Sequence, residues 1–206
     1  MKKRTKTVLV ILAAIVVFSV VWHFTVVDVT YRGNNAVRHF YEVFGDSGLA
    51  PEKRTAELVA ELGDCERYSL TLRRRLTAIW TSYGMALVGT YNEENYQKQK
   101  EYMTTHYVFA GPEDTAILKF VPTPDTAFSF DINRWHFRIL KEADGAHGLS
   151  YYYIPEVFRM VAFNDTEYKI AFLTFGDQDQ DCFGEHNDED ELQEFVNNQF
   201  SYHFKK

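Results

Sequence analysis

The chain lacks the short motifs that mark common catalytic and metal sites. Its 206 residues contain only 2 cysteines and 7 histidines. It has no His-Glu-x-x-His, Cys-x-x-Cys or Gly-x-Ser-x-Gly motif, and no glycine-rich phosphate loop. These absences argue against a zinc protease, a dithiol redox enzyme, an α/β-hydrolase and a P-loop nucleotide-binding protein.

Positive charge is scarce beyond the N-terminus. The chain has 22 Lys and Arg against 29 Asp and Glu, four of the basic residues precede residue 7, and all the acidic residues follow residue 27. Residues 28–206 therefore carry a net charge of −11. Their only basic cluster, Arg73 to Arg75, is more typical of a solvated edge than of a binding patch. Because nucleic-acid binding depends on clustered lysine and arginine, we expect no nucleic-acid partner.

The most prominent feature is an apolar run from Thr7 to Val27, in which fourteen residues are Val, Leu, Ile or Phe. At roughly 1.5 Å per residue it forms about 31 Å of helix, which matches a hydrocarbon core of about 30 Å. A buried core helix fits poorly, because the run has no polar face along its length. The sequence therefore predicts an N-terminal transmembrane helix.

A cleaved signal peptide is the alternative to a permanent anchor. Such a peptide has an apolar region of about 7 to 15 residues followed by a small-x-small cleavage site. Residues 20–24 offer no such site, so an uncleaved signal anchor is favoured over cleavage. The positive-inside rule then places residues 1–6 in the cytoplasm, 7–27 in the cell membrane and 28–206 outside the cytoplasm. We expect a single-pass protein with one exported domain.

Periodicity beyond the anchor predicts an α+β fold. Helices are expected from Asn34 or Asn35 to Gly45, from Pro51 to Gly63, from Asn92 to Gly111, and from Leu192 onward. Strands are expected at 79–91, 116–121, 127–132, 135–140, 151–154, 157–163 and 167–175, whereas 66–76 fits either a strand or a helix. The spacing leaves no room for crossover helices, so the sheet should be mostly antiparallel. Helices before the sheet and one C-terminal helix complete the predicted domain.

Two compositional features leave alternatives open. Aromatic residues make up 16% of the chain, which predicts a core and sheet of aromatic pairs, with a stacking surface for glycans or peptides as the alternative. Cys65 and Cys182 are the only cysteines, and an exported domain permits a disulfide between them. A bridge and two free thiols are equally consistent with the sequence. Asn164-Asp-Thr is a glycosylation sequon, which matters only if the host glycosylates its exported proteins.

An acidic loop is a candidate calcium site. Asp177, Asp179 and Asp181 stand at i, i+2 and i+4, and Asp188 is at position twelve counted from Asp177, as in a calcium-binding loop. The match to an EF-hand loop is partial, since Cys182 stands where the loop needs glycine. The alternative is a solvated acidic loop whose last charges begin a helix.

A second candidate site rests on a resemblance. Phe44-Gly-Asp-Ser47 resembles the opening block of GDSL-type serine hydrolases, and Asp144-Gly-Ala-His147 matches the spacing of the Asp-x-x-His pair of that family. The resemblance implies Ser47 as the nucleophile with Asp144 and His147 as its partners. Gly48 stands where the family block has leucine, and the Gly-x-Asn-Asp block is absent.

The leading prediction is a membrane-anchored extracytoplasmic protein that binds an unknown protein or small ligand without catalysis. It needs no cofactor. A hydrolase using Ser47, and a calcium-dependent binding module using residues 177–188, are the alternatives.

Overall fold

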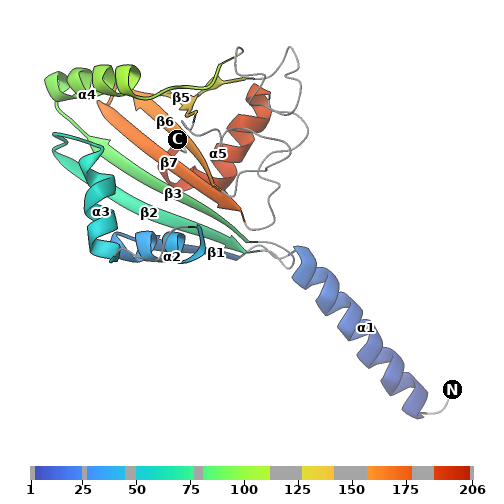
Figure 1. Ribbon diagram of the computed structural model, residues 1–206. Helices are drawn as coiled ribbons and strands as arrows, with labels where there is room; N and C mark the ends of the chain where they lie inside the picture. The colour runs from blue at the N-terminus through green and yellow to red at the C-terminus, as the bar shows by residue number, and fades with distance from the viewer. Residues whose placement is uncertain are drawn as a thin grey trace.

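The computed structural model describes residues 3–24, 27–44, 50–76, 81–111, 127–141, 157–177 and 188–204. The helices are α1 (Lys3–Phe24), α2 (Asn34–Phe44), α3 (Pro51–Ala60), α4 (Glu93–His106) and α5 (Glu189–Phe204). The strands are β1 (Val27–Arg32), β2 (Arg67–Leu76), β3 (Thr81–Thr90), β4 (Ser129–Ile132), β5 (Trp135–Ile139), β6 (Val157–Asn164) and β7 (Lys169–Asp177). They form one antiparallel sheet in the order β1-β2-β3-β7-β6-β5-β4 (Figure 1). The predicted α+β fold with an antiparallel sheet is confirmed.

The order of the elements corrects the prediction that helices precede the sheet. Helices α2 and α3 lie between β1 and β2, and α4 lies between β3 and β4. Strand β1 is missing from the prediction because its first residue, Val27, closes the apolar run and conceals the alternation that follows. The ambiguous segment 66–76 is strand β2, which pairs with both β1 and β3. The predicted strands 116–121 and 151–154 lie outside the described residues.

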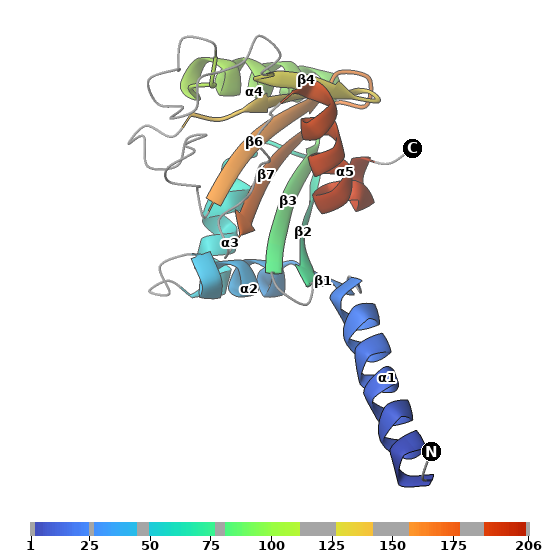
Figure 2. The ribbon, with the colours of Figure 1, turned by 90° about the vertical axis from the view of Figure 1, so that its right-hand side faces the viewer.

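Helices cover both faces of the sheet, as Figures 1 and 2 show. Successive strand residues point to opposite faces, so β3 and β7 supply both cores. Ala86 and Leu173 belong to the core beneath α5. Met85 and Phe172 belong to the core on the opposite face, which α2, α3 and α4 cover. The sheet is therefore the middle layer of the domain.

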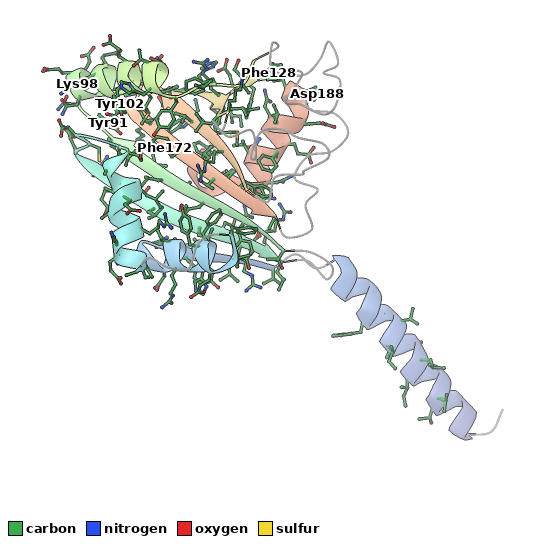
Figure 3. The ribbon with its side chains drawn as sticks, in the orientation of Figure 1. Tyr91, Lys98, Tyr102, Phe128, Phe172 and Asp188 are labelled. Atoms are coloured by element: carbon green, nitrogen blue, oxygen red, sulfur yellow. The ribbon has the colours of Figure 1, made fainter. Side chains whose placement is uncertain are left out.

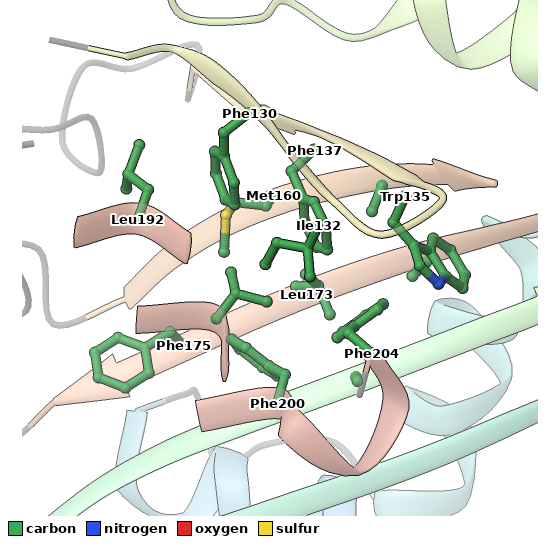
Figure 4. Close-up of a cluster of buried hydrophobic side chains, with 14 of the residues drawn as sticks. Phe130, Ile132, Trp135, Phe137, Met160, Leu173, Phe175, Leu192, Phe200 and Phe204 are labelled. Atoms are coloured by element: carbon green, nitrogen blue, oxygen red, sulfur yellow. The ribbon is translucent and has the colours of Figure 1, made fainter. Parts of the chain in front are cut away.

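Aromatic rings pack with aliphatic side chains in the core beneath α5 (Figure 4). Phe130 and Phe137 face each other across the β4–β5 hairpin and stack with ring centroids 5.0 Å apart. Phe204 meets Phe137 edge-on at 5.1 Å. Gly84 allows α5 to come close, because a Cβ there would lie 3.0 Å from the ring of Phe200. For these residues the predicted aromatic core is confirmed.

The basic run of β2 has a structural role. Arg73 and Arg75 donate hydrogen bonds from Nη1 to the backbone carbonyl of Asn198 in α5, at 2.8 and 3.2 Å. Arg73 also pairs with Asp28 of β1. The interpretation of this run as a solvated edge is wrong for Arg73, because its side chain is only 17% exposed and joins β1 to α5.

Helix α1 extends away from the sheet domain (Figures 1 and 2). Its consecutive residues Ile15, Val16, Val17 and Phe18 are 55%, 60%, 61% and 66% exposed. Successive residues are about 100° apart around a helix of 3.6 residues per turn, so these four side chains point in nearly all directions. Within the described part of the chain, no helix is both long enough and apolar enough to cross a membrane.

Candidate ligand-binding site

The residues of the predicted hydrolase site lie outside the described part of the chain. Ser47 falls within residues 45–49, and Asp144 and His147 fall within residues 142–156. The hydrolase hypothesis therefore stays a prediction. Cys182 also lies outside the described residues, whereas Cys65 is half-buried after α3, so the disulfide stays a prediction too.

The predicted calcium ligands are described only in part. Asp177 is the last residue of β7, and Asp179 and Asp181 lie outside the described residues. Oδ1 of Asp188 accepts a hydrogen bond from the backbone N–H of Glu191 at 2.9 Å, which is the geometry of a helix N-cap. For Asp188, this geometry supports the alternative that the last charges of the acidic loop begin a helix. Where the structure describes the chain, no group of three or more His, Cys, Asp or Glu side chains could hold a metal ion.

The sequon asparagine is buried in the β6–β7 turn. Asn164 is 1% exposed, and its Oδ1 accepts hydrogen bonds from the backbone N–H groups of Thr166 and Glu167 at 3.1 and 3.0 Å. Its side chain holds the turn, so it is not accessible as a glycosylation acceptor.

A cavity of about 240 Å³ lies on the sheet face that α2 and α3 cover. Its floor comes from Met85 and Leu87 of β3 and from Phe172 and Thr174 of β7. The strand register places Met85 opposite Thr174 and Leu87 opposite Phe172. Directly opposite residues point to the same face, so the four side chains form one continuous and mostly apolar patch. Figure 3 shows Phe172 on the sheet between α3 and α4.

The walls of the cavity come from three helical segments. Tyr41 of α2, Leu58 of α3, Glu61 at the end of α3 and Tyr107 after α4 all line it. The Tyr107 hydroxyl donates a hydrogen bond to Oε2 of Glu61. Burial and this bond raise the pKa of Tyr107. The phenol therefore stays protonated and joins the ends of α3 and α4 across the cavity.

Two cationic side chains and Leu140 complete the described lining. Arg159 of β6 stands opposite Thr174, and Lys141 follows β5. The backbone N–H of Lys141 donates to the carbonyl of Val108 at 2.8 Å, which places Lys141 close to the segment that follows α4. Among the described lining residues, these two cations face a single carboxylate, Glu61, which already accepts a hydrogen bond from a phenol. The described lining thus combines two cations with one carboxylate in an otherwise acidic domain.

No sequence motif marks these residues as a site. One signal was present, since Arg159 interrupts an otherwise apolar alternation with Val161 and Phe163 in β6. Arg159 shares a sheet face with these two buried residues, although its own side chain is exposed. A charged residue on such a face indicates a polar contact or a site. Glu61, Lys141 and Tyr107 give no such signal, because each follows the end of a helix or strand where polar residues are common.

The described lining contains groups that can bind a ligand with an acidic group. Its described members include no Ser, Cys or His, so they provide no hydroxyl or thiol nucleophile with a histidine base. An apolar floor with a few convergent polar groups is typical of a small-molecule site. Arg159 and Lys141 can form charge-assisted hydrogen bonds with an acidic group.

Comparisons with known proteins found no match for this chain. No protein-family model matches the chain, and neither a curated protein nor a solved structure gives a significant match. Any function must therefore be argued from the chemistry of the site.

Proposed function

We propose that the protein is a membrane-anchored, extracytoplasmic binding protein for a small molecule that has an apolar body and an acidic group. The cavity over β3 and β7 carries this proposal, because an apolar floor and two cationic side chains meet there. The protein performs no reaction on the ligand, which fits the residue types of the described lining.

The two halves of the ligand meet different parts of the cavity. The apolar body covers Met85, Leu87 and Phe172, and each Å² of apolar surface removed from water contributes about 25 cal/mol. The acidic group reaches Arg159 and Lys141, where a hydrogen bond to a charged group contributes about 1.5–3 kcal/mol. Apolar contact supplies affinity, and the cations select for the acid.

The anchor is supported by the sequence of residues 7–27 and by the exposure of the described side chains of α1. A helix with apolar side chains on all sides is stable in lipid, because its backbone hydrogen bonds are satisfied internally. Lys2, Lys3, Arg4 and Lys6 precede the apolar run, so the positive-inside rule leaves residues 1–6 in the cytoplasm. The binding domain, residues 28–206, then lies outside the cytoplasm.

Calorimetric titration of the full chain in lipid nanodiscs tests the binding proposal. The probes are 2-naphthoate, which has an aromatic body and a carboxylate, and its neutral counterpart 2-naphthalenemethanol. We expect saturable naphthoate binding and weaker binding of the alcohol. Arg159→Gln should weaken naphthoate binding by about 10-fold or more, as expected for the loss of a charged hydrogen bond, and leave the alcohol unaffected.

The matched control is Arg134→Gln, which removes the same charge from an exposed position in the β4–β5 turn. It should leave naphthoate binding unchanged. Equal losses in the two variants, or no saturable naphthoate binding beyond that of empty nanodiscs, would contradict the proposal.

A further inference from the structure

A second cavity, of about 380 Å³, lies between the end of α3 and one face of α4. Asn95, Lys98, Gln99 and Tyr102 line it from α4. Their spacing of i, i+3, i+4 and i+7 places them on the same side of the helix. Figure 3 shows Lys98 and Tyr102 on this helix.

Two amide side chains hold the walls of this cavity together. Nδ2 of Asn95 donates to the carbonyl of Asp64 at 3.2 Å, and Nε2 of Gln99 donates to the carbonyl of Glu61 at 2.8 Å. Gly63 leaves room for the end of the Gln99 side chain, because a Cβ there would lie 2.5 Å from Oε1 of Gln99. Gly63 also has a φ of +59°, which side chains rarely adopt. The cavity is therefore preformed.

Tyr102 adds an apolar surface to this polar cavity. Its side chain is 44% exposed, and its ring stacks on the ring of His106 with centroids 4.0 Å apart and planes 25° apart. Nδ1 of His106 lies 3.0 Å from the backbone carbonyl oxygen of Tyr102, so the stacked pair is fixed to α4. A phenol ring held in this way offers a flat apolar surface to a ligand.

The charges that line the cavity have mixed signs. Glu61 and Asp64 would repel an anion, whereas Lys98 would repel a cation. A neutral molecule rich in hydroxyl groups can donate to the carboxylates and accept from the ammonium group at the same time. A sugar ring has such hydroxyls, and its C–H face can pack on Tyr102. We infer that this cavity binds a neutral saccharide.

The inference does not depend on the first cavity, although Glu61 lines both. Saturation-transfer difference NMR on the full chain in nanodiscs tests it, with cellobiose, maltose and N,N′-diacetylchitobiose as probes. We expect transfer to the ring C–H protons of at least one of the three sugars. Tyr102→Ala should abolish this signal, whereas Tyr102→Phe should keep it because the ring face remains.

The matched control is Tyr68→Ala, which removes a tyrosine of similar exposure, 50%, from the start of β2. It should leave the signal unchanged, and a far-UV circular dichroism spectrum equal to that of the unmodified chain shows that each variant is folded. No transfer to any of the three sugars would overturn the inference. The same signal in Tyr102→Ala as in the unmodified chain, or equal loss in folded Tyr102→Ala and Tyr68→Ala, would also overturn it.

Discussion

Hydroxyl groups of buried tyrosines join the helices to the sheet that forms the floor of the first cavity. Tyr91, just after β3, donates from its hydroxyl to the Leu62 carbonyl at 2.8 Å, and burial raises its pKa. Tyr96 of α4 donates in the same way to Asp165 in the β6–β7 turn. A typical bond of this kind contributes about 1 kcal/mol net. These contacts fix the ends of α3 and α4 relative to the strands.

Asp165 is the carboxylate whose protonation should weaken the domain in acid. Hydrogen bonds from Lys100 and Tyr96 hold the pKa of Asp165 below its ordinary value of 3.8. Nζ of Lys100 lies 2.6 Å from Oδ1 of Asp165. Because the native pKa is lowered, the stabilising contribution is fully present above the ordinary value and is lost as the pH falls through the native pKa.

We expect Asp165→Asn to lower the free energy of unfolding at neutral pH and to make its decrease in acid shallower. The effect should stay below about 1 kcal/mol, because the Asp165 side chain is 65% exposed and solvent screens the pair. Urea unfolding at a series of pH values measures it. Glu94→Gln, at an exposed carboxylate in the first turn of α4, is the control. Identical pH profiles for the two variants would show that Asp165 has no special role.

Local signals identify the starts of helices well in this chain, whereas the predicted end of α4 at Gly111 lies beyond its observed end at His106. The sequence Asn92-Glu-Glu predicts a capped helix, and Oδ1 of Asn92 does accept a hydrogen bond from the backbone N–H of Asn95 at 2.9 Å. The N-terminal residue Pro51 likewise predicts the start of α3. Such signals succeed because the atoms that satisfy a helix end lie within a few residues of it.

Elements that depend on distant partners are harder to predict. Within the described residues, strand β1 pairs with β2 through contacts such as Tyr31 with Leu72, and its short alternation does not indicate which strand it pairs with. The first cavity depends on distant partners even more than β1 does. Met85, Phe172 and Arg159 become neighbours only because β7 lies between β3 and β6 in the sheet. The order of the strands was not predicted from the sequence, so the cavity that depends on this order could not be predicted either.

The start of α5 gives a prediction about a single element. Asp188→Ala removes the N-cap and should lower the free energy of unfolding by about 1 kcal/mol, within a range of about 0.5–2 kcal/mol. Asp188→Ser should recover most of that loss, because the serine hydroxyl can accept the same hydrogen bond from Glu191. Chemical denaturation measures both variants.

The Asp188→Ser variant also distinguishes a role of Asp188 as the helix N-cap from a role as a calcium ligand. If the carboxylate bound calcium, millimolar calcium would raise the unfolding temperature of the unmodified chain but not that of Asp188→Ser. We expect calcium to leave both unchanged. Equal destabilisation by the alanine and serine changes would rule out the cap as the reason for the effect.

The molecule as a whole combines an apolar rod with an acidic domain. Figures 1 and 2 show α1 directed away from the sheet domain, and residues 28–206 carry a net charge of −11. An apolar helix whose described side chains, within residues 7–18, are exposed needs an apolar environment or a partner to bury it. The proposed insertion into a bilayer would meet that need without any contact to the acidic domain.

Changing one residue in the middle of the rod tests this arrangement. Val16→Arg should reduce the fraction of the chain that resists alkaline carbonate extraction from membranes, because arginine at the centre of a helix costs about 2.5–3.5 kcal/mol on insertion. Val29→Arg adds the same charge at an exposed position in β1, outside the apolar run, and should have no effect. Recovery of the unmodified full chain from a detergent-free soluble fraction would contradict the anchor.

The methionine methyl groups provide a readout for the cavity over β3 and β7. The chain has four methionines, Met1, Met85, Met103 and Met160. Met85 lies on the cavity floor. Met103 is a buried residue of α4, and Met160 lies in the core beneath α5. A titration of the ¹³C-methionine-labelled full chain in nanodiscs with 2-naphthoate, followed by methyl NMR, should therefore shift the Met85 signal saturably and leave the Met103 and Met160 signals in place. A Met85 signal that does not move, or equal shifts of all three, would contradict ligand binding in this cavity.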